Sequence, residues 1–369
     1  MTPSKVYYTD LHVDPGTSLL QKLERLIRAA GMGEIDFRQK FTALKLHFGE
    51  EGNLAYLRPD YVKVVADLVK EWGGVPFLTD CNPLYVGSRK NAVDHLNVAM
   101  LHGFGPMTTG CQVIIADGLK GTDEGIVPVP CGEYVKEAKI GRAIVDADII
   151  VSVNHFKGHE NAGFGGALKN LGMGCGSRAG KMEQHASGKP HVEQPLCTGC
   201  RTCARQCAHG AISFGEDRKA SIDHSRCVGC GRCLGACNFD AIQPPDSHSN
   251  QRLNQKIAEY SWAVLAGKPS FHISLVIDVS PYCDCHGEND IPLVPDVGFF
   301  ASFDPVALDQ ACADACNRMP PMPGSMIQDS SPKEDRFTSA FPDTDWQVAL
   351  AHAEKLGLGT RAYELVTLK

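Results

Sequence analysis

Apolar residues recur along the first half of the chain in two patterns, short runs typical of strands and longer stretches with helical spacing. Buried strands are predicted at residues 5–13, 42–48, 75–80, 111–118 and 147–153. Helices are predicted between them at residues 18–31, 60–74 and 89–103. This alternation predicts an α/β fold, in which a mostly parallel sheet carries helices on both faces.

The periodicity stops near residue 188 and returns after residue 246. The segment between is rich in cysteine and short turns, which indicates a small α+β insert. Beyond it a helix is predicted at 249–267, a strand at 271–280 and a helix at 304–318, where Asp304 is the N-cap and Pro305 follows it. We therefore predict an α/β domain in two parts, 1–187 and 247–369, separated by the insert at 188–246; the alternative is that the last part forms a third unit.

Charge and composition narrow the class of protein. The 369 residues carry a formal net charge of −7 and no Lys/Arg-rich block, which argues against a nucleic-acid partner. The first residues lack the apolar region of a secretory signal, and no apolar run has the length of a membrane span, so no membrane partner is expected. Sixteen cysteines without an export signal indicate a reducing compartment. We expect a cytoplasmic protein whose cysteines bind metal or do chemistry.

Eight of these cysteines form two runs with the spacing C-x₂-C-x₂-C-x₃-C, which resembles bacterial two-cluster ferredoxins. In that pattern the fourth cysteine of each run binds the cluster of the other run. The first [4Fe–4S] cluster is therefore predicted to bind Cys197, Cys200, Cys203 and Cys237. The second is predicted to bind Cys227, Cys230, Cys233 and Cys207. Paired zinc sites are the alternative, but they use separated C-x₂-C pairs. The proline that ends each ferredoxin run is replaced by Ala208 and Asn238.

A glycine-rich stretch at residues 154–176 follows the strand predicted at 147–153, where ligands of parallel sheets gather. Its glycines allow a backbone to approach a ligand closely, and its lysines, with Lys181 nearby, can hold a carboxylate or phosphate. Candidate catalytic residues there and at other strand ends are Lys45, Asp80, His155, Lys157, His159 and Lys169. Candidate cofactor-binding residues are Gly163, Gly165 and Gly166. The alternative is a mobile loop with solvated lysines.

Cys283 and Cys285 lie just past the strand predicted at 271–280 and form a possible third site. Two thiolates with a histidine suit an additional zinc or iron ion. A redox dithiol, or ordinary reduced thiols in a turn, fit the same residues. Cys312 and Cys316 share one helical face with apolar residues, which predicts core packing instead.

Several longer segments resemble a known family. They are "LKLHFGEEGN", "LTDCNPLYVGSRKNAVDH", "HFKGHENAGFGGALKNLGMG" and "DVGFFASFDPVALDQACAD". The chain is similar in these to the uncharacterised Fe–S centre proteins of bacteria and archaea, part of domain of unknown function family 362. The resemblance implies the α/β architecture, iron–sulfur content and a cytoplasmic, anaerobic setting, and it favours a working site in the glycine-rich stretch. It implies no substrate.

Three functions fit these patterns. The first is an iron–sulfur oxidoreductase, in which two clusters carry electrons between an external donor or acceptor protein and a small anionic substrate in an α/β cleft. The second is a non-catalytic electron carrier that docks a partner enzyme. The third is a metal-handling or maturation protein with a third metal at Cys283 and Cys285. No dinucleotide or P-loop motif is visible in the sequence.

Overall fold

The computed structural model describes residues 2–85, 87–185, 189–207, 209–227, 232–243, 250–331 and 333–368. Its main feature is an eight-stranded sheet with the order β16-β1-β15-β14-β7-β2-β3-β4. The strands are β1 (Ser4–Thr9), β2 (Phe41–Lys45), β3 (Val75–Asp80), β4 (Val113–Ile115), β7 (Ile149–His155), β14 (Ser270–Val276), β15 (Gly298–Ser302) and β16 (Tyr363–Thr367). Only β15 runs against its neighbours, so the predicted α/β fold with a mostly parallel sheet is confirmed.

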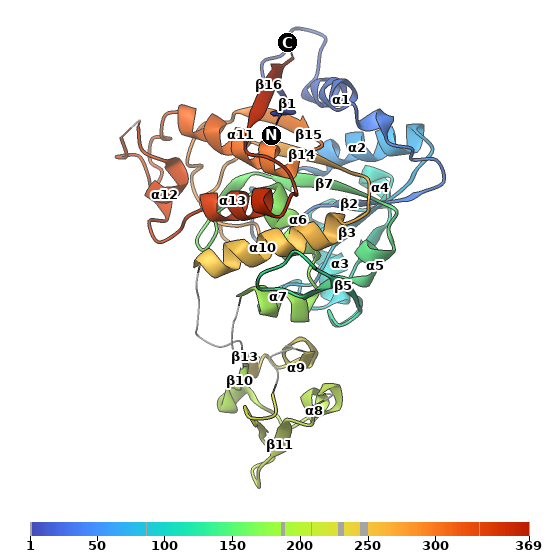
Figure 1. Ribbon diagram of the computed structural model, residues 1–369, viewed down its shortest axis with the longest axis vertical. Coiled ribbons are helices and arrows are strands. Elements are labelled where there is room, and N and C mark those ends of the chain that lie inside the picture. The colour runs from blue at the N-terminus through green and yellow to red at the C-terminus, as the bar shows by residue number, and fades with distance from the viewer. Residues whose placement is uncertain are drawn as a thin grey trace.

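Helices cover both faces of this sheet (Figure 1). One face packs on α1 (Leu19–Ala29) and α2 (Pro59–Glu71). The other packs on α6 (Ala167–Cys175), α10 (Asn250–Leu265) and α11 (Pro305–Arg318). Side chains alternate along the strands between the two layers, because successive residues of a strand point to opposite faces. Phe299 and Ala301 lie in the first layer, for example, and Phe300 lies in the second.

Shorter elements complete the α/β body. The helices are η1 (Met32–Glu34), α3 (Ala92–Leu101), α4 (Pro106–Thr109), α5 (Arg142–Asp146), α7 (Arg178–His185), α12 (Arg336–Ala340) and α13 (Gln347–Lys355). Two antiparallel hairpins are formed by β5 (Glu124–Pro128) with β6 (Glu137–Gly141), and by β8 (Lys157–His159) with β9 (Gly163–Gly165). Within the described residues no helix is long and apolar enough to cross a membrane.

A small unit follows α7 in the chain and contains the predicted cluster ligands that the structure describes (Figure 1). Its elements are β10 (His191–Val192), η2 (Gln194–Leu196), α8 (Thr202–Gln206), β11 (Ile212–Phe214), β12 (Ala220–Ile222), α9 (Arg232–Ala236) and β13 (Ile242–Gln243). β10 pairs with β13, and β11 pairs with β12. The boundaries predicted near residues 187 and 246 lie outside the described residues, as does Cys230, so the domain limits stay a prediction.

The C-terminal part of the chain joins the same sheet as the N-terminal part. β14 lies next to β7, and β16 lies next to β1. The N-cap predicted at Asp304 is confirmed, since its carboxylate accepts hydrogen bonds from the N–H groups of Val306 and Ala307. The glycine-rich stretch, in contrast, is more ordered than a loop, because it forms the end of β7, the β8–β9 hairpin and α6.

Candidate functional site

A cavity of about 390 Å³ opens at the carboxyl ends of the central strands. Lys45, Asp80 and His155 are the last residues of β2, β3 and β7, and all three line it. From β2 the chain builds the sheet outward through β3 and β4, and then crosses to β7 on the other side of β2. Such a reversal of strand order leaves a crevice at the strand ends, which is the usual ligand site in open α/β sheets.

The floor of the cavity is a buried ion pair. Lys45 Nζ lies 3.0 Å from Asp80 Oδ1 and donates to Asn170 Oδ1 at 2.8 Å. Arg89 Nη1 lies 3.6 Å from the other Asp80 oxygen, and Arg89 Nε donates to Glu50 at 2.8 Å. Burial by itself raises the pKa of Asp80, but the charge of Lys45 and those of the other cationic groups around it together hold that pKa well below its usual range. Lys45 and Asp80 are therefore bound first of all to each other.

His155 and Lys157 are both tied to Asp284, which lies in the loop between β14 and β15. His155 Nδ1 is 2.8 Å from Asp284 Oδ1, and Lys157 Nζ is 3.1 Å from Asp284 Oδ2. His155 Nε2 also lies 2.9 Å from the carbonyl oxygen of Ile277. Burial raises the pKa of Asp284, but His155 and Lys157 bring it well below its usual range. Because both ring nitrogens are engaged, His155 acts here to fix the loop.

The glycines of the stretch permit close packing. A Cβ on Gly166 would lie 2.2 Å from Asp309 Oδ1, the carboxylate that accepts hydrogen bonds from the N–H groups of Ala167 and Leu168 at the start of α6. A Cβ on Gly172 would lie 2.2 Å from the carbonyl oxygen of Ile257 in α10. Gly165 and Gly166 line the cavity, whereas Gly163, with φ of 84°, packs on Trp346. Their role in binding a cofactor stays a prediction.

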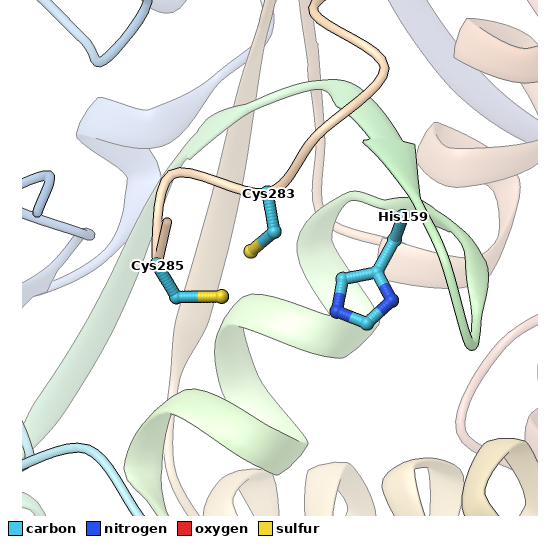
Figure 2. A group of neighbouring side chains, drawn as sticks. All are labelled: His159, Cys283 and Cys285. Carbon is cyan, nitrogen blue, oxygen red and sulfur yellow. The ribbon is translucent and has the colours of Figure 1, made fainter. Parts of the chain in front are cut away.

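Cys283, Cys285 and His159 come together at one wall of the cavity (Figure 2). Their ligand atoms lie within 4.8 Å of one another, close enough to hold one metal ion. Lys169 Nζ donates to Cys283 Sγ at 3.4 Å. Cys283 is buried, with 2% of its surface exposed, whereas Cys285 lies nearer to solvent. The two sulfur atoms thus share a site but differ in their surroundings.

The charges around the two thiols differ accordingly. The hydrogen bond from Cys285 and the ammonium groups of Lys169 and Lys157 hold the pKa of Cys283 well below its usual range, against the effect of burial. The same hydrogen bond, together with burial, raises the pKa of Cys285 well above its usual range. Burial lowers the pKa of Lys169, but the two sulfur atoms outweigh it and raise that pKa above its usual range. The surroundings therefore favour a thiolate at Cys283, with the ammonium group of Lys169 beside it.

The predicted ligands of the first cluster surround one hollow of the small unit. Cys197, Cys200 and Cys203 from the first run and Cys237 from the second all line it. Backbone N–H groups reach two of the predicted ligand sulfurs, from Ala220 to Cys197 at 3.3 Å and from Ala211 to Cys207 at 3.4 Å. Of the second set, Cys207, Cys227 and Cys233 are described. Four thiols around one hollow fit a four-iron cluster, whose ligands are cysteine thiolates.

Several cavity residues were not singled out from the sequence. They are Glu50, Arg89, Glu160 and Asn170. Glu50 and Arg89 lie in the segments quoted for the family resemblance, but nothing in their spacing shows that they meet. Lys181 does reach the cavity, as expected, and its Nζ donates to the carbonyl oxygens of Gly176 at 2.6 Å and Gly174 at 3.3 Å. Cys312 and Cys316 are fully buried in the second helix layer, in agreement with core packing.

Two solved structures are similar in part to this chain. The lactate racemase apoprotein from Thermoanaerobacterium thermosaccharolyticum has 11% sequence identity and a TM-score of 0.33, over 74% of this chain and 51% of that one. A protein from Thermotoga maritima has 13% identity and a TM-score of 0.42, over 83% of this chain and 59% of that one. The chain thus spans between half and three-fifths of the length of these structures.

Among curated protein sequences, none matches this chain. A family model described as a domain of unknown function, DUF362, matches residues 42–314, which include both the cavity and the small unit. The match covers more than half of the chain and includes the glycine-rich stretch, the cysteine runs and the loop with Cys283 and Cys285. The chain therefore belongs to the DUF362 family.

Proposed function

We propose that this chain is an iron–sulfur oxidoreductase that moves electrons through two [4Fe–4S] clusters to or from a small anionic substrate in the cavity. The observation that carries the proposal is the position of Leu84. Leu84 lines the cavity, and it also belongs to the same hydrophobic cluster as Cys203, Cys233 and Cys237 of the small unit. Three of the predicted cluster ligands therefore pack on a residue that lines the cavity, which supports electron transfer across this wall.

Helix α7 strengthens this connection. Met182 packs in the hydrophobic cluster with the cysteines, while Lys181 and His185 of the same helix line the cavity. An ion pair between Lys90 and Asp240 also joins the α/β body to the small unit. A cluster held by Cys197, Cys200, Cys203 and Cys237 would supply one-electron transfer at this wall.

The charges that line the cavity favour an anion. Five cationic side chains and three carboxylates line the cavity. The cationic side chains are Lys45, Arg89, Lys157, Lys169 and Lys181, and the carboxylates are Glu50, Asp80 and Glu160. Lys45 and Arg89 are bound to Asp80 and Glu50, and Lys157 is bound to Asp284 behind the lining. Lys169 and Lys181 are left as the ammonium groups best placed to hold a carboxylate or phosphate as point charges.

Metal and sulfide counts on protein purified without oxygen test the cluster part of this proposal. We expect about eight irons and about eight acid-labile sulfides per chain, and electron paramagnetic resonance signals of reduced clusters after dithionite is added. Fewer than about four irons, with zinc in their place, would overturn the assignment of two clusters.

Anion binding tests the enzymatic part. Citrate and inorganic phosphate, as probes, are expected to raise the melting temperature of the protein through the cavity ammonium groups. Lys181→Met should abolish the rise, whereas Lys120→Met, a change at an exposed lysine outside the cavity, should preserve it. Clusters that titrate normally in a protein whose cavity binds neither anion would favour an electron carrier instead.

A further inference from the structure

We propose that Cys283 and Cys285 are a redox-active dithiol, which receives electrons from the clusters and reduces a disulfide substrate. This inference rests on the proposed function for the source of its electrons. The existence of the dithiol itself rests only on the geometry of the loop between β14 and β15.

That loop holds the two sulfur atoms on the same side. Cys283 and Cys285 line the cavity, while Asp284 between them turns away from it and is bound to His155 and Lys157. The backbone is fixed as well, since Glu50 N–H donates to the carbonyl oxygen of Asp284 at 2.8 Å, and His286 N–H donates to that of Cys283 at 2.9 Å. Figure 2 shows both thiols beside His159, with their sulfurs turned toward each other. The pair is therefore held in position to close and open a disulfide.

The environments of the two thiols match the two tasks of such a pair. A thiolate is the attacking species in thiol–disulfide exchange, and a neighbouring cation favours it. The contact of Lys169 with Cys283 supplies that cation, and the lowered pKa of Cys283 agrees with it. Cys285 lies nearer to solvent, has its sulfur close to that of Cys283, and is placed to resolve a mixed disulfide.

Two contacts disfavour a metal ion at the same place. The N–H groups of Asn161 and Ala162 both donate to His159 Nδ1, each at 3.1 Å. In the neutral ring the proton must then be on Nε2, so that this nitrogen donates toward the sulfurs and offers no lone pair to a metal. Metal-binding histidines have the opposite arrangement, in which the second nitrogen donates its proton to an acceptor. The ammonium group of Lys169 would also repel a cation bound to Cys283.

A short route joins the pair to the small unit. Tyr85 lines the cavity together with Cys285. Leu84, the next residue in the chain, packs with the predicted cluster ligands. Electrons that leave a cluster at Cys233 or Cys237 would therefore reach the cavity at the part of its lining formed by Leu84 and Tyr85.

The chemistry balances with what the proposal supplies. The clusters, when bound, would supply one electron each. Two electrons and one proton from solvent would break the Cys283–Cys285 disulfide and leave a thiolate at Cys283 and a thiol at Cys285. The thiolate then attacks one sulfur of the substrate disulfide, forms a mixed disulfide and releases one substrate thiolate. Cys285 attacks the mixed disulfide, its proton goes to the second substrate thiol, and the Cys283–Cys285 disulfide forms again.

Oxidised glutathione, an anionic disulfide, is the probe that we would use first. Protein purified without oxygen would be mixed with it, quenched in acid, alkylated under denaturing conditions and digested for mass spectrometry. We expect Cys283 and Cys285 to lose both alkylation sites while two glutathione thiols appear per chain. Cys312 and Cys316, which are buried in the core, serve as controls in the same digest and should stay alkylated. Cys285→Ser should trap glutathione on Cys283, which a merely structural thiol would not do.

A variant without clusters, Cys203→Ser with Cys233→Ser, separates this inference from the proposed function. Its pair should still be oxidised by glutathione disulfide, but re-reduction by dithionite should be about tenfold slower or more. Equal re-reduction rates would overturn the electron route and leave the dithiol. A pair that resists oxidation in a protein with about eight irons would overturn the dithiol and leave the proposed function. One extra metal per chain that is lost in Cys283→Ser would make this a metal site and overturn the inference.

Discussion

The small unit and the cavity are built in opposite ways. All eight predicted cluster ligands lie between residues 197 and 237, and their spacing alone predicts which of them share a cluster. The cavity, in contrast, collects side chains from Lys45 in β2 to His286 beyond β14. Local loops can present thiols to a cluster, whereas a cavity at strand ends exists only after the whole sheet has formed. The first kind of site can be recognised from the spacing of residues in a sequence. The second can be recognised only when the order of the strands in the sheet is known.

The strongest test of the ligand sets predicted from spacing uses variants with one cysteine changed in each of the two runs. Cys203→Ser, Cys237→Ser and the double variant should each lower the iron content from about eight to about four per chain, because the two thiols line the same hollow. If each run held its own cluster, the double variant would lose both. Cys131→Ser, at an exposed and isolated cysteine, is the control and should keep all the iron.

The next effect concerns the floor of the cavity. Lys45→Met leaves Asp80 buried without its closest cation, so we expect it to lower the free energy of unfolding by about 3–5 kcal/mol. Urea denaturation without oxygen measures this loss. Lys40→Met is the matched control, because the exposed pair of Lys40 with Asp36 should contribute less than about 1 kcal/mol. Similar stabilities of the two variants would show that the sheet ends do not depend on the buried pair.

A smaller effect is expected where the glycine-rich stretch enters α6. Asp309→Ala removes both acceptors for the N–H groups of Ala167 and Leu168 and should cost about 1–3 kcal/mol of stability. Asp309→Asn keeps one acceptor oxygen and should lose less, by the same urea measurement. An Asn variant as weak as the Ala variant would mean that the carboxylate charge, and not the hydrogen bonds, orders the stretch.

The smallest effect is a pH dependence at the rim. Burial raises the pKa of Glu160, but the hydrogen bond with His286, 3.0 Å long, and the charge of His159 together lower that pKa to about 2. The pKa of His286 is raised by the same bond. Glu160 therefore stabilises the fold above about pH 4.5 and loses this contribution as the pH falls toward 2. His286 stabilises the fold below about pH 6.5 and loses this contribution as the pH rises past its folded pKa.

Glu160→Gln should accordingly lower the stability by about 0.5–1 kcal/mol near pH 6 and by less near pH 3, because the pair is partly exposed. Thermal melting of both proteins at the two pH values measures the difference. Glu193→Gln, in the similar but more exposed pair with His191, should change stability little at either pH. A larger loss of stability in Glu160→Gln near pH 3 than near pH 6 would contradict an ion pair between Glu160 and His286.

The sequence predicts the elements of the sheet better than the site between them. The strand predicted at 75–80 has the bounds of β3, because a short apolar run with turn residues on each side marks it in the sequence. Helix α6 was not predicted, since Gly172 and Gly174 lower helix propensity, and only the approach of α10 and Lys45 shows why glycine stands there. The bond between Asp284 and His155 joins residues 129 positions apart, and no local pattern indicates it.

The contact between Lys169 and Cys283 would also couple product release to reduction. When the pair is reduced, the thiolate compensates the ammonium charge. When the pair is a disulfide, that charge has no sulfur anion beside it and can retain an anionic product. By reciprocity, an anion that binds more tightly to the oxidised form makes the disulfide harder to reduce, and the electrons that reduce it weaken the hold on the anion. Lys169 would thus retain an anionic product while the pair is a disulfide, and reduction of the disulfide would release that product.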